Sequence, residues 1–200
     1  MSGCAGRVIA EMPEWRTLGK VSGNCMAQLQ VLDDRIFVPP PRTGPRPRTR
    51  LALPHLQMEQ WPPEEIVEQL VDRCLRLPYV RPRESRMASP QSLALSLPDR
   101  FAAGPPDAFI DDHEFCHLHP LPEGSIHLTL PYEIRRSAVA KGWAEQHPAA
   151  RLGIMPQALV MVYAPRNARE LAIVMELISS SYEFARFGGA GQPPDDAIME

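Results

Sequence analysis

Polar and apolar residues alternate most clearly between Glu114 and Leu130, where the chain reads EFCHLHPLPEGSIHLTL. Successive side chains of a strand point to opposite faces, so this pattern predicts a β-hairpin with one apolar and one polar face. The apolar face holds Cys116, Leu118, Ile126, Leu128 and Leu130, and the polar face holds His117, His119, Ser125, His127 and Thr129. A hairpin that closes around Leu121 to Gly124, with His119 opposite Ser125, places His117 directly across from His127, with their Cβ atoms about 5 Å apart.

Apolar residues that recur at helical spacing predict three helices. The first begins after Pro62 and Pro63 and ends before Pro78. The second is expected over Tyr132 to Gln146, although Gly142 weakens it. The third and longest begins at Asn167, which serves as N-cap, with Glu170 in the position of a capping box. It ends at residues 188–189, two glycines.

Two further apolar runs, Ser92 to Leu97 and Ala158 to Tyr163, predict strands, and Asp107 to Ile110 predicts a short helical turn. The order of elements favours an α+β fold, a two-layer sandwich of about four mainly antiparallel strands with three helices packed on one face. The apolar face of the hairpin would lie under the helices. Its histidine face would point away from them, to solvent or to a cleft.

The 23 prolines lie mainly between these elements and divide the chain. We expect an N-terminal extension over residues 1–38 with a possible strand from Gln30 to Val38, and a Pro/Arg-rich arm over 39–60. The α+β domain follows over 61–187, and a disordered tail over 188–200. The arm can be a solvated linker, or it can fold over the domain and present an arginine to an anionic substrate or a buried carboxylate.

Composition excludes several classes of protein. The net charge is -3 and 44% of the residues are hydrophobic, which gives no electrostatic case for binding nucleic acid or an anionic membrane. The four cysteines form no C-x-x-C pair, which favours free thiols in a reducing compartment. No window approaches the roughly 18 apolar residues of a membrane helix, so we expect a soluble, cytoplasmic protein.

The three hairpin histidines have three possible roles. They can be a solvated outer face of the sheet, three nitrogen ligands for Zn or Fe, or metal-free acid/base groups that take a proton from an enol or phenol. Glu114 has the parity of the apolar face, so it can join the histidines only through a bulge or a frayed strand start.

The chain resembles the fungal luciferases and the larger set of bacterial and fungal luciferase-domain proteins, and we expect a bacterial member. The resemblance rests on ordered blocks, namely RTGPRP from Arg42, EFCHLH from Glu114 with SIHL from Ser125, KGW from Lys141 with His147 and Pro148, and YAPRN from Tyr163 with Glu170. It implies oxidation of a hydroxylated styryl-pyrone by molecular oxygen without flavin or another organic cofactor, followed by loss of carbon dioxide and emission of light. The fungal enzymes carry an N-terminal membrane segment that this sequence does not show, so we expect no membrane association.

The resemblance also gives His117, His119, His127, Arg166 and Tyr163 as site residues. Arg166 can anchor a substrate anion or form a salt bridge to a glutamate, and Tyr163 can donate to an oxyanion or be buried and satisfied. Trp143 can fill the core or stack on an aromatic substrate. His147 can cap the C-terminus of the second helix or belong to the site.

Our leading hypothesis is an oxygenase for a hydroxylated aromatic or pyrone-type small molecule, with His127 or His117 as base and Arg166 holding the anion. No organic cofactor is expected, and a metal variant would hold Fe or Zn on His117, His119 and His127. The competing hypothesis is a non-enzymatic domain that binds a ligand or a protein partner. The sequence leaves the oligomeric state open.

Overall fold

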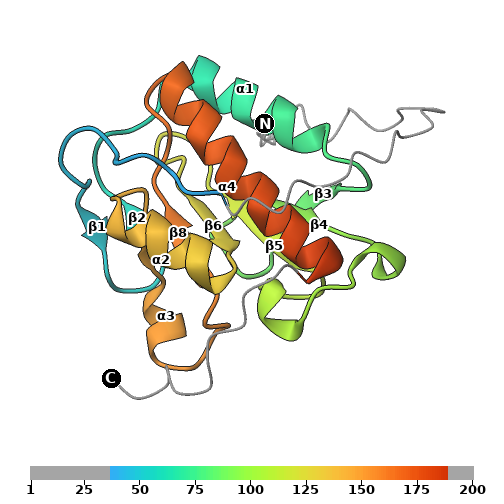
Figure 1. The fold of residues 1–200 in the computed structure, drawn as a ribbon. Coiled ribbons are helices and arrows are strands. Elements are labelled where there is room, and N and C mark those ends of the chain that lie inside the picture. Colours follow the sequence, from blue (N-terminus) through green and yellow to red (C-terminus); the bar gives the residue numbers. More distant parts are fainter. Residues whose placement is uncertain (1–36, 189–200) are drawn as a thin grey trace, which may run out of the picture. The chain divides into compact units, whose positions relative to one another are not determined.

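The computed structural model describes residues 37–188, whose main element is an antiparallel sheet of six strands in the order β3-β4-β5-β6-β8-β7 (Figure 1). These strands are β3 (Arg81–Glu84), β4 (Leu93–Ser96), β5 (Glu114–Leu118), β6 (Ile126–Thr129), β7 (Ala144–Gln146) and β8 (Leu159–Val162). Two short strands, β1 (Thr49–Arg50) and β2 (Leu56–Gln57), pair as a separate ribbon. The α+β prediction is confirmed, with six strands in the sheet rather than about four.

The helices are α1 (Glu64–Leu75), α2 (Tyr132–Ala140), α3 (Pro148–Arg151) and α4 (Ala168–Phe187). Figure 1 shows α4 crossing the sheet over β5 and β6, with α1 beside it. The Ser181 hydroxyl of α4 donates to the backbone carbonyl of Phe115 at 3.1 Å, which fixes this helix on β5. In residues 37–188 no helix combines the length and the apolar character needed to cross a bilayer.

The hairpin has the predicted register. His117 pairs with His127 across β5 and β6, and the amide of His119 donates to the carbonyl of Ser125 at 2.9 Å. The expectation that the histidine face could be solvated is wrong, because 1% of His117, 3% of His119 and 4% of His127 is exposed. The rings of His55, from the arm, and His147, at the start of α3, pack against His127 on this face.

A β-bulge at Phe115 changes the face on which Glu114 lies. Leu95 pairs with Cys116, but the next residue of β4, Ser96, pairs with Glu114, so Phe115 is an extra residue in β5. A bulge of this kind reverses the alternation of side chains beyond it. Glu114 therefore joins the histidine face, while the ring of Phe115 packs against Tyr182 of α4 with ring centroids 5.9 Å apart.

The second helix is shorter than predicted. It ends at Ala140, and Gly142 then adopts a left-handed conformation with φ +80°. Glycine alone adopts this conformation without steric penalty, and it turns the chain back so that residues 144–146 form the edge strand β7. His147 consequently caps the N-terminus of α3 rather than the C-terminus of the second helix.

The N-cap of α4 is as predicted, but the capping box is incomplete. The Asn167 side chain accepts from the amide of Glu170 at 3.0 Å. The carboxylate of Glu170 accepts from the backbone and side chain of Arg166 instead of reaching back to Asn167. Gly188, with φ +66°, ends the helix as expected.

The arm folds onto the domain and is not a solvated linker, which agrees with the second of the two alternatives that the sequence left open. Arg42 forms an ion pair with Glu170 at 3.6 Å, and the two side chains are 2% and 7% exposed. Cys74 and Cys116 are buried free thiols, as predicted. The predicted extension and its strand lie outside the described residues, apart from residues 37 and 38, as do Cys4, Cys25 and the tail from 189 onward.

Replacing Gly124 in the hairpin turn by alanine should destabilise the protein more than the same change at Gly153. Both glycines have positive φ, +64° and +68°, so both variants carry a similar backbone strain. Only at Gly124 would the new Cβ lie 2.6 Å from Pro62 Cγ, whereas nothing lies within 4 Å at Gly153. We expect Gly124→Ala to lose about 1–3 kcal/mol more in urea denaturation. Equal losses in the two variants would contradict the close packing of this turn.

Candidate functional site

Five of the six histidines of the chain converge in one buried cluster on the sheet. We call His55, His117, His119, His127 and His147 the histidine cluster. His127 lies at its centre, with ring centroids 4.8–5.5 Å from those of the other four. The sixth, His113, lies outside the cluster and faces Asp99 at 3.3 Å.

The buried carboxylate of Glu114 begins a chain of hydrogen bonds into the cluster. Its Oε1 lies 2.7 Å from His117 Nδ1, and His117 Nε2 lies 3.0 Å from His127 Nδ1. Ser85 donates to the same carboxylate at 2.9 Å, and the guanidinium of Arg83 lies 3.3 Å from its other oxygen. A carboxylate oxygen that faces a ring nitrogen at this distance accepts a hydrogen bond from His117 Nδ1–H.

A second carboxylate, Glu145 of β7, orients His55. His55 Nε2 lies 2.6 Å from Glu145 Oε1, and the Tyr163 hydroxyl donates to Oε2 at 3.0 Å. Burial alone would raise the pKa of Glu145, but hydrogen bonds from His55, Thr49 and Tyr163 outweigh it and lower that pKa. The carboxylate therefore accepts from His55 Nε2–H, which leaves Nδ1 of that ring with its lone pair.

The remaining two rings have polar partners of different kinds. His119 Nδ1 lies 3.1 Å from the Ser89 hydroxyl and 3.6 Å from the carboxylate of Glu123. His147 Nδ1 accepts from the backbone amide of Ala149 at 3.2 Å. A neutral imidazole that accepts at Nδ1 carries its proton on Nε2, so His147 is a donor towards the cluster.

Burial keeps three rings of the cluster, His119, His127 and His147, uncharged. Desolvation, reinforced by neighbouring imidazoles, lowers the pKa of His119 to about 3 and that of His147 to about 4, and it lowers the pKa of His127 well below its usual value. At neutral pH these three rings are neutral and each carries one lone pair. Neutral imidazole is the form that binds metal ions and accepts protons.

Three ring nitrogens of the cluster are buried and have no hydrogen-bond partner among the described residues. They are His55 Nδ1, His119 Nε2 and His127 Nε2. Leaving such groups unpaired costs about 1–3 kcal/mol each, and native interiors pair nearly all of them. The cluster therefore has unused capacity to bind a reactant or an ion.

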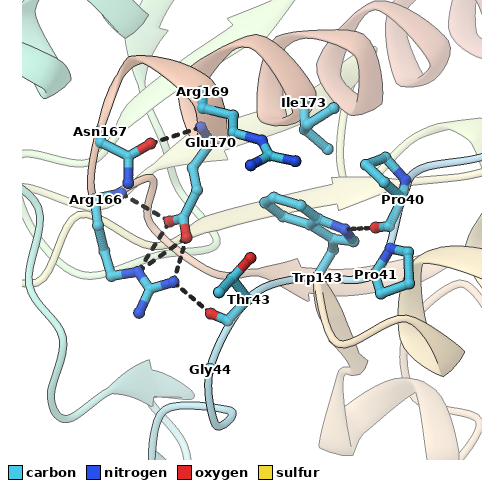
Figure 2. Close-up of a pocket in the computed structure, with 10 residues that line it drawn as sticks. All are labelled: Pro40, Pro41, Thr43, Gly44, Trp143, Arg166, Asn167, Arg169, Glu170 and Ile173. Carbon is cyan, nitrogen blue, oxygen red and sulfur yellow. Dashed lines mark hydrogen bonds and ion pairs between the residues drawn. The ribbon is translucent and has the colours of Figure 1, made fainter.

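A pocket of about 530 Å³ lies next to the arm, at the N-terminus of α4 (Figure 2). Trp143, Pro40, Pro41 and Ile173 give it apolar walls, and Arg166, Arg169 and Glu170 give it charge. Its size suits one small organic molecule. None of its lining residues is a histidine, so this pocket and the histidine cluster are separate parts of the described structure.

Trp143 is buried in the core and also lines the pocket. Its side chain is 3% exposed, and its indole N–H donates to the carbonyl of Pro40 (Figure 2).

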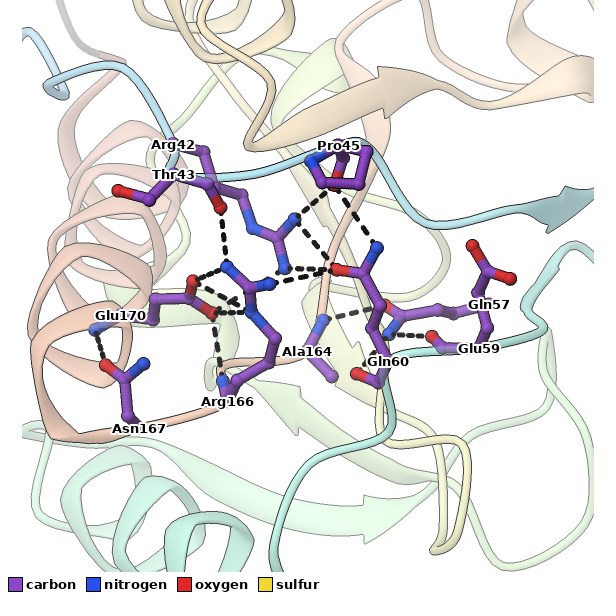
Figure 3. Close-up of polar contacts among 10 residues, drawn as sticks. All are labelled: Arg42, Thr43, Pro45, Gln57, Glu59, Gln60, Ala164, Arg166, Asn167 and Glu170. Atoms are coloured by element: carbon purple, nitrogen blue, oxygen red, sulfur yellow. Dashed lines mark hydrogen bonds and ion pairs between the residues drawn. The ribbon is translucent and has the colours of Figure 1, made fainter.

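Arg166 lies in the pocket and not in the histidine cluster. Figure 3 shows its guanidinium between Glu170, the carbonyl of Thr43 and the side chain of Gln60. Within residues 37–188 no hydrogen bond, ion pair or ring contact joins Arg166 to a histidine. The salt bridge that the sequence left as an alternative is present, and the structure does not bring this arginine to the predicted base.

Arg42 and Tyr163 connect the two regions. The Arg42 guanidinium lies 5.5 Å from the centroid of the Tyr163 ring and pairs with Glu170 of the pocket. The hydroxyl of the same tyrosine reaches Glu145 and, through it, His55. Tyr163 is 1% exposed, so its hydroxyl is a satisfied buried donor.

Comparison with known proteins finds similarity to luciferases. Residues 112–181, which include β5, β6 and most of α4, match the family described as "Luciferase domain". Luciferases of Armillaria gallica and Armillaria ostoyae are each 31% identical over 172 residues, which cover 76% of this chain. The chain is therefore similar to luciferase-domain proteins.

The match is partial in length. The chain spans 63% of the length of the two Armillaria proteins, and a luciferase of Neonothopanus nambi is 29% identical over 86 residues, 32% of its own length. These relatives are fungal and give no support to the expectation of a bacterial protein. No solved structure matches the chain.

Two members of the site were missed in the sequence. His55 lies in an arm whose strands have two residues each, too short to show any periodicity. Glu145 falls where the sequence pattern predicts the end of a helix, and only the left-handed Gly142 reveals a strand. The one available signal for His55 in the sequence is that it is an isolated histidine in a chain that has six histidines.

Arg42→Ala should destabilise the protein far more than Arg48→Ala. Both arginines pair with a glutamate, but the Arg42–Glu170 pair is buried, whereas the side chains of Arg48 and Glu59 are 80% and 37% exposed. Removing one partner of a buried pair costs about 3 kcal/mol, while an exposed pair contributes little. We expect a clear loss of unfolding free energy in urea for Arg42→Ala and no measurable change for Arg48→Ala. Similar values for both would contradict a structural role of the arm.

Proposed function

We propose that this luciferase-domain protein is an oxygen-dependent enzyme that acts on a small hydroxylated aromatic or pyrone-type compound at the histidine cluster. The observation that carries the proposal is the Glu145–His55 pair, a carboxylate-backed imidazole whose second nitrogen is buried and unpaired. An imidazole held in this way is the usual form of a general base. The relatives are named luciferases, which supports oxygen as the co-substrate.

We place the base at His55 rather than at His117 or His127, because His55 has both a carboxylate in hydrogen-bond contact and a second nitrogen without a partner among the described residues. His117 has both nitrogens in use, one on Glu114 and one on His127. His55 Nδ1 has its lone pair and no partner, and Glu145 stabilises the imidazolium that forms when His55 takes a proton. His147, which carries its proton on Nε2, donates to the oxygen anion that develops on the substrate.

The reaction then needs no added reductant. His55 removes the proton of the ring hydroxyl or enol, and the resulting anion transfers one electron to oxygen. A carbon–oxygen bond forms between the ring carbon and the reduced oxygen, and the proton on His55 passes to the terminal peroxide oxygen. The product is a hydroperoxide, in which the substrate has supplied both electrons. The site contributes orientation and electrostatic stabilisation of the anion.

An oxygen electrode and a panel of hydroxylated aromatic compounds and pyrones test this function. We expect at least one compound to consume oxygen, and His55→Ala to lower that rate by roughly 10²–10⁴-fold because the general base is lost. His113→Asn is the matched control, since this histidine lies outside the cluster, and its rate should equal that of the unmodified protein. Added imidazole should restore part of the rate of His55→Ala.

Flat traces across the panel would contradict the enzyme proposal. They would favour a ligand-binding domain instead, for which the 530 Å³ pocket with its apolar walls and arginines is the candidate surface.

A further inference from the structure

We propose that His117 Nε2, His119 Nε2 and His127 Nδ1 bind one divalent transition-metal ion. Each of these rings offers one nitrogen within 4.8 Å of those of the other two, and all three side chains are buried. The site deepens the proposed function, because the ion would lie in the same cluster as His55. Its test does not depend on that function, since metal binding is measured without substrate.

The contact between His117 and His127 has the spacing of neighbouring metal ligands. Their facing nitrogens lie 3.0 Å apart. Two nitrogens bound to one zinc ion at 2.0–2.1 Å in a tetrahedral arrangement lie about 3.3 Å apart, so the rings need to move only slightly to admit an ion. The cross-strand pairing of β5 and β6 and the two-residue step from His117 to His119 hold the three rings on one face.

In two of the rings, His117 and His119, a polar contact at Nδ1 favours a lone pair on the other nitrogen, Nε2. Glu114 accepts from His117 Nδ1, and both the Ser89 hydroxyl and, at a longer distance, the carboxylate of Glu123 face His119 Nδ1. With its proton on Nδ1, each of these two rings has its lone pair on Nε2. Carboxylates and hydroxyls in this position orient histidine ligands and raise their basicity in known metal sites. His119 Nε2 is one of the buried nitrogens without a partner.

A second group of rings, His55, His127 and His147, is equally close but less suited to a metal ion. The Ala149 amide occupies the Nδ1 lone pair of His147, so Nε2 of that ring bears a proton. This group therefore includes an N–H donor where a metal ion needs a lone pair, which fits proton transfer better than coordination. His127 is common to both groups and connects the ion to the proposed base.

The ligand chemistry selects the class of ion. Three imidazole nitrogens favour Zn²⁺ or Fe²⁺ over Mg²⁺ and Ca²⁺, which prefer oxygen ligands. A three-histidine site also leaves a coordination position for a small molecule. The thiol of Cys116 is on the opposite, apolar face of β5, and its pKa is raised by burial, so it is not a competing ligand.

The experiment uses full-length protein without a histidine tag, stripped with a chelator and titrated with Zn²⁺ or, for its visible absorption, Co²⁺. We expect about one ion per chain by elemental analysis, and absorption bands typical of low-coordinate Co²⁺. His119→Ala should weaken binding by 100-fold or more, whereas His55→Ala and His113→Asn should retain it. Glu114→Gln should weaken binding by roughly 10–100-fold, because the charge behind His117 is lost.

Two results would overturn the site: a stoichiometry near zero in the unmodified protein with both ions, or loss of metal in His55→Ala with retention in His119→Ala. Circular dichroism and thermal unfolding of each variant separate ligand loss from misfolding. Oxygen consumption by a protein that binds no metal would overturn the metal site alone. Metal binding without oxygen consumption on the panel would overturn the proposed function alone.

Discussion

Burial of five imidazoles against one another is the constraint on which the rest of this structure depends. Neutral rings can be buried together only if their N–H groups have acceptors, and Glu114 and Glu145 supply two of them from opposite sides. Each carboxylate needs its own support, which Arg83 and Ser85 give to the first and Tyr163 gives to the second. The polar interior is therefore a hydrogen-bond network. The residues that support the two carboxylates help to determine which imidazole nitrogens carry protons.

The protein also shows how a proline-rich segment becomes part of a core. Arg42 and His55 come from the arm, and both are buried against partners far away in the sequence. Prolines limit the conformations of the unfolded arm, so docking it costs less entropy than docking a flexible chain of the same length. The buried arginine gives this docking a specific partner, Glu170, which the α4 N-terminus holds in place.

The sequence predicted those parts of the fold in which local pattern and tertiary structure agree. Alternation gave the hairpin register and the facing of His117 and His127, and capping residues gave the start and end of α4. Strand β3 was missed because its residues, RPRE, are charged and include a proline, as suits a protected sheet edge but not a hydrophobic pattern. The sequence left the partner of Arg166 open, because sequence order carries no information on which of two neighbouring regions a side chain enters.

The attachment of the arm has a consequence for access to the interior. Around His55 the arm is joined to the domain mainly by polar contacts: the Gln57 amide donates to Glu123, its side chain accepts from the Ala164 amide, and residues 51–54 are exposed. Segments held this way open locally at a smaller free energy than the whole domain unfolds. Transient detachment of this one stretch would remove a ring from the cluster and admit water or a reactant while the sheet stays intact.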